Sequence, residues 1–167
     1  TIHKAYLASC KAGTAPLDLT RPLVIYSRYE LNQMLLRRAE AAGTLIEKTR
    51  VLDIQRRGAG WALKTSSGTL DADYCIVATG ARNPLREVGT KWCAADTMMA
   101  LGYYIPVERD HIDIRFFSGF EGYIWIFPRN NHLSAGICGK GETAQALRAR
   151  LEKYLAEKGI SLKGSTF

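Results

Sequence analysis

Long hydrophobic runs are missing from this chain of 167 residues. Its apolar runs, such as 75–78 and 123–127, are far shorter than a membrane-spanning helix requires. The start lacks a charged head followed by an apolar stretch, so no secretory signal is expected and we predict a cytoplasmic protein. An initiator Met is also absent, which favours a piece of a longer protein.

Metal-ligand motifs are absent as well. The four cysteines, Cys10, Cys75, Cys93 and Cys138, form no C-x-x-C pair, and no histidine stands at ligand spacing from them. This pattern argues against a zinc or iron–sulfur site, and we predict no metal. The net charge is +7, but the basic residues do not cluster and no nucleic-acid motif accompanies them. We therefore predict no nucleic-acid partner, and a solvated basic surface or a preference for anionic ligands are the two interpretations of the charge.

The first half of the sequence predicts one helix and several strands. Residues 22–26 are typical of a strand, and 27–42 of an amphipathic helix with Ser27 as its cap and Gly43 after its end. Alternation predicts a meander with strands at 45–47, 51–55, 61–65 and 69–70. The continuous apolar run 73–78 predicts a strand buried on both faces of a parallel sheet, ending at Thr79 and Gly80.

The second half predicts an antiparallel sheet and a helix. Strands are expected at 97–107, 112–117, 123–127 and 132–138, with a hairpin turn at 128–131. An amphipathic helix is expected over 142–158, closed by Gly159.

The order of elements in the first half resembles the middle of a flavoprotein of the glutathione-reductase or para-hydroxybenzoate-hydroxylase type. The resemblance rests on S-R-Y-E-L-x-x-x-L at 27–35, A-A-G at 41–43, Val51, and I-V-A-T-G-A-R-N at 76–83. It implies FAD as cofactor, with Arg28 near the flavin or its phosphates, Val51 beside the adenine, and Thr79 and Gly80 at the strand end where ligands sit. A surface role for Arg28 and a strand-core role for Val51 remain the alternatives.

A second motif sharpens this resemblance. Gly122-Tyr123-x-Trp125-x-Phe127-Pro128, followed by Gly136-x-Cys138, is similar to the Y-x-W-x-F-P…G-x-G motif of the geranylgeranyl reductase family, which includes electron-transfer flavoprotein dehydrogenases. Cys138 replaces the second glycine. The resemblance implies that Tyr123, Trp125 and Phe127 line a substrate pocket. Their spacing of two places all three on one face of a strand, where core packing is the alternative.

The fingerprint G-x-G-x-x-G of dinucleotide-binding folds does not occur in the chain. We therefore expect a fragment that lacks the first βαβ unit and binds FAD weakly or not at all by itself. The expected fold is α/β (α+β), with a partial FAD-binding domain and β-meander at 1–91 and an antiparallel-sheet substrate domain at 92–167.

The resemblance implies a parent enzyme that reduces carbon–carbon double bonds of an isoprenoid or similar apolar substrate, with NAD(P)H as donor. We expect the fragment alone to be inactive, and we expect peripheral membrane association only through the substrate. A flavin-dependent aromatic hydroxylase or halogenase is one alternative, and a non-enzymatic packing domain is another. We predict no catalytic residue. His3, His111 and His132 have no acid or Ser partner at a recognisable spacing and are expected at the surface or in turns, and Asp71 and Asp73 are expected to be turn and strand-edge charges.

Overall fold

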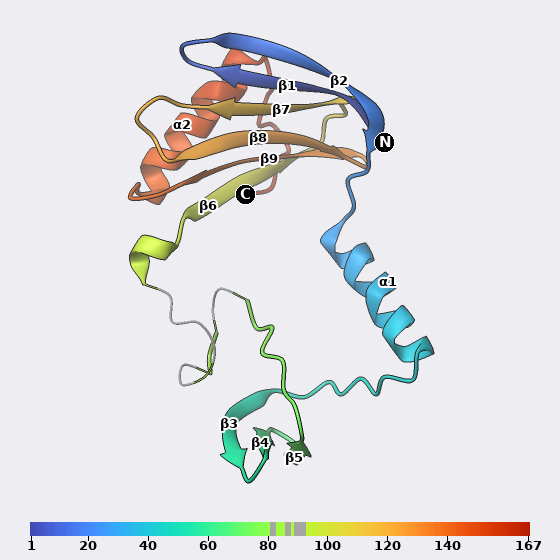
Figure 1. Ribbon diagram of the computed structural model, residues 1–167. Coiled ribbons are helices and arrows are strands. Elements are labelled where there is room, and N and C mark those ends of the chain that lie inside the picture. The colour runs from blue at the N-terminus through green and yellow to red at the C-terminus, as the bar shows by residue number, and fades with distance from the viewer. Residues whose placement is uncertain (81–82, 86–87, 89–92) are drawn as a thin grey trace. The chain divides into compact units, whose positions relative to one another are not determined.

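The computed structural model describes residues 1–80, 83–85, 88 and 93–167 (Figure 1). The chain forms two compact units, one of residues 1–33 with 97–167 and one of residues 34–96. This division differs from the predicted boundary between residues 91 and 92, because the N-terminal hairpin joins the C-terminal sheet. Positions 81, 82, 91 and 92, where the flavoprotein motif and the predicted boundary fall, lie outside the described residues.

The larger unit is built on a six-stranded mixed sheet of order β2-β1-β7-β8-β9-β6. All neighbouring strands are antiparallel except β1 and β7, which run parallel. The strands are β1 (Ile2–Ser9), β2 (Gly13–Leu23), β6 (Met99–Ile105), β7 (His111–Phe116), β8 (Gly122–Arg129) and β9 (His132–Gly139). The last four confirm the strands predicted for the second half. The β8–β9 turn is a two-residue loop in which Asn131 has a positive φ of 66°.

Helix α2 (Ala144–Glu157) packs across β6 and β9 on one face of this sheet (Figure 1). Thr143 caps it, since its hydroxyl accepts a hydrogen bond of 3.2 Å from the Ala146 N–H. Gly159 follows the helix with a φ of 66°, as expected of a C-terminal glycine. The helix and the sheet together bury the main hydrophobic core: Tyr103, Ile105, Ile124, Ile126, Leu133, Ala135, Ile137, Leu147, Leu151, Tyr154, Leu155 and Ile160.

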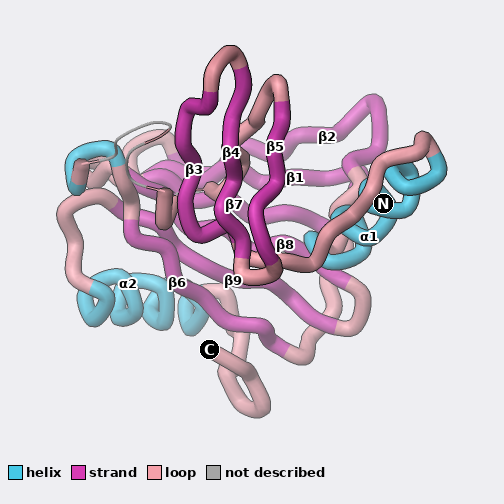
Figure 2. Tube along the Cα trace, turned by 90° about the horizontal axis from the view of Figure 1, so that it is seen from below, coloured by secondary structure: helices cyan, strands magenta, loops and turns pink. Residues whose placement is uncertain are grey.

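The smaller unit contains a three-stranded antiparallel meander, β3 (Val51–Arg57), β4 (Gly60–Thr65) and β5 (Gly68–Ala72) (Figure 2). These strands confirm the predicted meander, although residues 45–47 form no strand. The predicted buried strand at 73–78 is wrong. Tyr74 and Ile76 are each 91% exposed, and the segment has no strand partner among the described residues. A parallel strand needs hydrogen-bonded neighbours to be buried.

Helix α1 (Arg28–Ala41) confirms the predicted helix and its start. The Ser27 hydroxyl accepts a bond of 3.5 Å from the Glu30 N–H, the geometry of a cap. The prediction that the apolar face of this amphipathic helix is buried is wrong. The structure describes every residue of α1, and none of them is buried; Leu35, for example, is 50% exposed. The strand predicted at 22–26 ends early, since β2 stops at Leu23.

Strand β2 begins at Gly13, whose φ of 73° suits the tight turn that follows β1.

Within the part of the chain that the structure describes, no helix has the length and apolar character that crossing a membrane would demand.

Candidate functional site

Strand β8 carries a row of aromatic side chains on the face of the sheet opposite α2. Alternation places Ile124 and Ile126 in the core, both fully buried, and turns Tyr123, Trp125 and Phe127 to the other face. The prediction that these three rings share one face is thus confirmed. Tyr123 is 37% exposed and Trp125 is half-buried. Phe127, also half-buried, packs against a second buried cluster of Ile2, Ala5 and Ile112, so this face is closed in part near Phe127 and open at Tyr123.

The rings form a continuous track along the strand. The centroids of Tyr123 and Trp125 lie 5.9 Å apart, and those of Trp125 and Phe127 lie 6.5 Å apart. Phe116 on β7 extends the track, with its ring centroid 6.2 Å from that of Tyr123. We call Phe116, Tyr123, Trp125 and Phe127 the aromatic track.

The glycine of the second motif has a packing role under this track. Gly136 on β9 pairs directly with Trp125, and a Cβ added to it would lie 2.2 Å from the indole Cζ2. The indole therefore rests on the bare backbone of β9, which any side chain at position 136 would displace. Cys138 pairs with Tyr123 two residues further on and is buried, so a thiol is accommodated where the family motif has its second glycine.

A groove lies beside the β8–β9 turn, at the Phe127 end of the aromatic track. Arg129 follows Phe127 by two residues and so lies on the same face of β8, and His132 is its partner on β9. The groove has a volume of about 540 Å³ and brings the turn and β6 together with the start of α1. Its lining residues are Ile25, Ser27, Arg28, Tyr29, Glu30, Tyr104, Arg129, Asn130 and His132.

Two hydrogen bonds hold the basic side chains of the groove in place. Arg129 donates from Nη1 to the Tyr26 carbonyl. His132 Nδ1 lies 2.9 Å from the Asn130 carbonyl, which can only accept, so Nδ1 carries a proton. The His132 ring also meets Tyr104 edge-on, with centroids 5.3 Å apart. His132, expected at a surface or turn, is thus a half-buried groove residue.

The other face of the sheet buries a charged cluster. The Asp113 carboxylate, 3% exposed, lies 3.3 Å from Lys158 Nζ, 3.5 Å from Arg109 Nη1 and 3.5 Å from His111 Nε2. Nearby Tyr154 is buried, and desolvation raises the pKa of its hydroxyl. The cluster ties β7 to the end of α2, so we assign it to stability.

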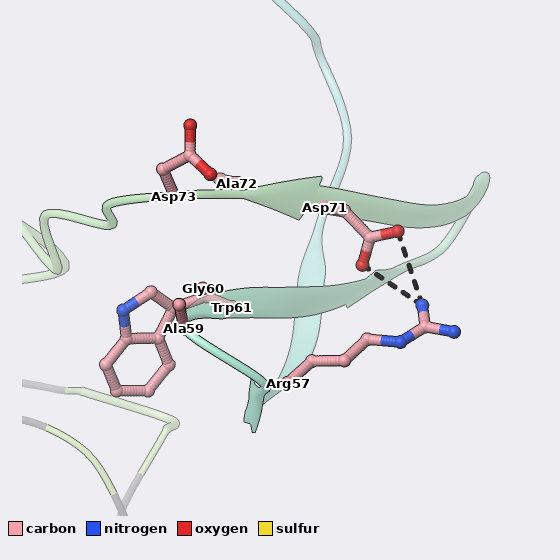
Figure 3. A pocket seen from close by; sticks show the side chains of 7 residues that line it. All are labelled: Arg57, Ala59, Gly60, Trp61, Asp71, Ala72 and Asp73. Carbon is pink, nitrogen blue, oxygen red and sulfur yellow. Dashed lines mark hydrogen bonds and ion pairs between the residues drawn. The ribbon is translucent and has the colours of Figure 1, made fainter.

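The smaller unit has a shallow pocket of about 390 Å³ over the meander (Figure 3). Asp71 accepts two hydrogen bonds from Arg57 Nη1, at 3.1 and 3.3 Å, so it pairs with that arginine and not with Asp73. Both side chains of this pair are more than half exposed. The pocket offers paired surface charges and no arrangement for acid–base chemistry.

The four predicted cofactor residues fall in both units. Arg28, at the first turn of α1, lines the groove of the larger unit. In the smaller unit Val51 begins β3, paired with Thr65, and is half-buried. Thr79 Oγ1 lies 2.8 Å from Asn83 Oδ1, and Gly80 has a φ of 78°.

Comparison with known proteins identifies the family. The profile of the FAD-dependent oxidoreductase family (DAO) matches residues 24–161. The chain belongs to this family. An uncharacterized protein of Methanosarcina barkeri is 24% identical over 140 residues, which cover 80% of this chain and 36% of that protein.

Solved flavoproteins share the fold. A myxobacterial chondrochloren halogenase, an FAD-dependent enzyme, matches with a TM-score of 0.69 and 22% identity, covering 99% of this chain and 45% of its own. A flavoprotein/dehydrogenase from Cytophaga hutchinsonii matches with a TM-score of 0.65 and 16% identity, covering 96% of this chain and 47% of its own. A peptidyl tryptophan dihydroxylase matches with a TM-score of 0.63 and 18% identity, covering 95% of this chain and 36% of its own. The chain therefore spans less than half the length of these relatives.

The FAD-dependent oxidoreductase family implies FAD, but the residues described here do not form a complete site for it. Among the described residues other than its chain neighbours, none has an atom within 4 Å of a Cβ built on Gly80, and both Thr79 and Gly80 are exposed. A phosphate cradle is normally a concave set of backbone N–H groups at a helix N-terminus, and the 73–80 segment leads into no helix among the described residues.

The described residues also hold no group of three or more His, Cys, Asp or Glu side chains suited to a metal ion. Sequence reasoning found Tyr123, Trp125 and Phe127 of the aromatic track but missed Phe116 and the groove. The sequence signal that could have pointed to the groove is the period of two along β8, because this period places Arg129 on the same face of the strand as Phe127.

Proposed function

We propose that this chain supplies the substrate-facing wall of an FAD-dependent oxidoreductase. The observation that carries the proposal is the aromatic track, with its three β8 rings on the sheet face that α2 leaves uncovered. Half-exposed aromatic side chains gathered on one face are typical of a ligand-binding surface. The cluster of Asp113 and His111 faces α2 instead, so we assign no catalytic acid or base to it.

We further propose that the substrate is elongated and apolar, and that the intact flavoenzyme reduces its carbon–carbon double bond. The track follows a strand, and side chains on one face of a strand repeat at intervals of about 6.6 Å. Such a surface suits an isoprenoid chain that contacts several rings in sequence. A flavin bound in the intact enzyme would supply the electron transfer, with NAD(P)H as the proposed donor.

A second candidate is hydroxylation or halogenation of an aromatic ring. The tilted rings of Tyr123 and Trp125, 56° apart, offer an exposed edge and face on which a flat substrate could stack. A halogenase and a dihydroxylase share the fold, but likeness at this identity concerns the fold alone.

Calorimetric titration of this chain with farnesol and with 2-naphthol tests the proposed surface. We expect farnesol to bind more tightly, and Trp125→Ala to weaken its binding at least about tenfold through lost apolar contact. Because Trp125 is half-buried, the stability loss should be smaller than the roughly 3–5 kcal/mol of a fully buried aromatic residue. Tighter binding of 2-naphthol would favour the second candidate.

Ile126→Ala is the matched control, since Ile126 lies next to Trp125 on the core face and is fully buried. It should cost about 2–5 kcal/mol of stability and leave the farnesol affinity of the folded protein unchanged. If Trp125→Ala also leaves the farnesol affinity unchanged, the aromatic track serves only for packing, and the result favours the alternative of a non-enzymatic packing domain. Mass spectrometry of products from the intact flavoenzyme then separates a gain of two hydrogens from a gain of oxygen or halogen.

A further inference from the structure

Strand β7 carries an arginine without a counter-charge on the α2 side of the sheet. Arg115 pairs with Ile124, whose side chain is fully buried in the core under α2. Asp113, two residues earlier, faces the same side and contacts Lys158 Nζ at 3.3 Å. Among the described residues, Arg115 itself takes part in no ion pair. The positive charge of its guanidinium is therefore not offset by a neighbouring carboxylate.

The Arg115 guanidinium lies against two aromatic rings. Its Cζ is 5.1 Å from the centroid of the Tyr154 ring and 5.7 Å from that of Phe117. Nε is buried and has no hydrogen-bond partner in the described part of the chain. Nη2 reaches the sulfur of Cys10 at 3.9 Å, and Cys10 is exposed. The rings thus hold the guanidinium in place, while its strong N–H donors stay unused and one end of it opens to solvent.

The Tyr154 hydroxyl is a second unused donor beside this guanidinium. The side chain is only 3% exposed, and its oxygen has no hydrogen-bond partner among the described residues. The Lys158 ammonium, 5.6 Å from the ring centroid, can only donate and so offers the hydroxyl proton no acceptor. Desolvation raises the pKa of Tyr154, so the hydroxyl keeps its proton at neutral pH. Buried hydroxyls in folded proteins normally have a partner, because an unpaired one is destabilising.

We propose that Arg115, Tyr154 and Lys158 form a binding site for a small oxyanion, a phosphate or carboxylate group. The site lies on the sheet face opposite the aromatic track and is independent of the proposed function. The oxyanion accepts hydrogen bonds from the Arg115 guanidinium and the Tyr154 hydroxyl, and the Lys158 ammonium adds positive charge. A guanidinium suits such a ligand because its planar fork matches phosphate and carboxylate oxygens.

The Asp113 carboxylate is the opposing charge at this site. Arg109 Nη1 and Lys158 Nζ contact it at 3.5 and 3.3 Å, which offsets its repulsion of an anion. The bound oxyanion supplies both groups that the cluster lacks, a counter-charge for Arg115 and an acceptor for Tyr154.

Calorimetric titration of this chain with inorganic phosphate and with acetate, at constant ionic strength, tests the site. Tyr154→Phe removes only the hydroxyl and should weaken phosphate binding at least about tenfold, as expected for the loss of a hydrogen bond to a charged group. Arg115→Met should weaken it by at least as much. Arg150→Met is the matched control, because Arg150 also lies against Phe117 but already pairs with Glu142 at 3.2 Å. This control should leave the phosphate affinity unchanged.

Thermal melts separate a lost ligand from a damaged core. Without phosphate, Tyr154→Phe should melt no lower than the unaltered chain, because the variant no longer buries an unpaired hydroxyl. Added phosphate should raise the melting temperature of the unaltered chain and of Arg150→Met by mass action, and raise that of Tyr154→Phe much less. If Arg115→Met does not fold, the comparison of Tyr154→Phe with the unaltered chain decides the question.

No binding of phosphate or acetate to the unaltered chain would overturn the inference, as would an equal loss of affinity in Arg150→Met. Glycerol 3-phosphate distinguishes the sources of the oxyanion. Tighter binding than inorganic phosphate, with the same dependence on Arg115, supports a phosphate ester as ligand, whereas equal or weaker binding supports a free ion. Farnesol affinity should be unchanged in Tyr154→Phe, so failure of the oxyanion site leaves the proposed function standing.

Discussion

The two units of this chain use similar strands with different outcomes. In the larger unit, alternating strands meet α2 and bury a core in which Ile124 and Leu151 are fully enclosed. In the smaller unit, the meander β3–β5 alternates equally well, yet among its described strand residues only Ile54 and Thr65 are buried. The difference shows that alternation is sufficient to form a strand, whereas burial requires a second layer to cover one face.

The same lesson applies to α1 and to segment 73–78. Both have the apolar pattern of buried elements, and both are exposed. Their sequences are typical of elements that lie inside an α/β sheet, but hydrophobic character alone does not supply the neighbours. Three pairs of substitutions test this difference between the units, beginning with the largest expected effect.

The largest effect should come from the core under α2. We expect Leu151→Ala, at a fully buried position, to lower the free energy of unfolding by about 2–5 kcal/mol because it leaves a cavity. The matched change in the smaller unit is Leu45→Ala, where the leucine is 81% exposed, and it should alter stability by less than about 0.5 kcal/mol. Urea unfolding of both variants checks this, and equal losses would contradict the contrast.

The second comparison concerns charge. Asp113→Asn should cost about 3 kcal/mol, at the lower end of the range for breaking a buried ion pair, because its cationic partners Arg109 and Lys158 keep some contact with water. Asp71→Asn in the smaller unit breaks an ion pair whose two side chains are 65% and 69% exposed, and it should cost less than about 1 kcal/mol. Unfolding at neutral pH measures both, and a larger loss for Asp71→Asn would refute the assignment.

The smallest effect should come from the aromatic track. Gly136→Ala places a methyl group against the Trp125 indole, and we expect a loss of about 1–3 kcal/mol together with altered tryptophan fluorescence. In the Trp125→Ala background the same methyl group has room. The loss should then shrink, which is the coupling that a double-mutant cycle measures. Strictly additive losses would show that the indole does not rest on Gly136.

Local pattern predicted most of the larger unit. Helix α2 and β6–β9 fall within three residues of their expected bounds, and the shared face of Tyr123, Trp125 and Phe127 follows from the period of two. The hairpin β1–β2 was missed because β2 contains Pro16 and Pro22, and because β1 pairs in parallel with a strand about a hundred residues away. Prolines weaken a strand signal, and the local sequence of β1 does not identify a partner strand so far away in the chain.

The groove escaped sequence analysis for a related reason. Arg28 and Arg129 lie about a hundred residues apart, and only the folded sheet brings them to one lining. The cofactor roles of Arg28, Val51, Thr79 and Gly80 remain predictions. We expect weak FAD binding by this chain alone, since G-x-G-x-x-G is absent from it; a submicromolar affinity in a fluorescence titration would contradict this.

The most direct test of the central claim is photo-crosslinking with a farnesol whose tail carries a diazirine, followed by peptide mass spectrometry. The account predicts adducts on the aromatic track, chiefly on Tyr123, Trp125 and Phe127 of β8, with labelling suppressed by excess unlabelled farnesol. Specific labelling confined to α2 or to the β3–β5 meander would contradict it.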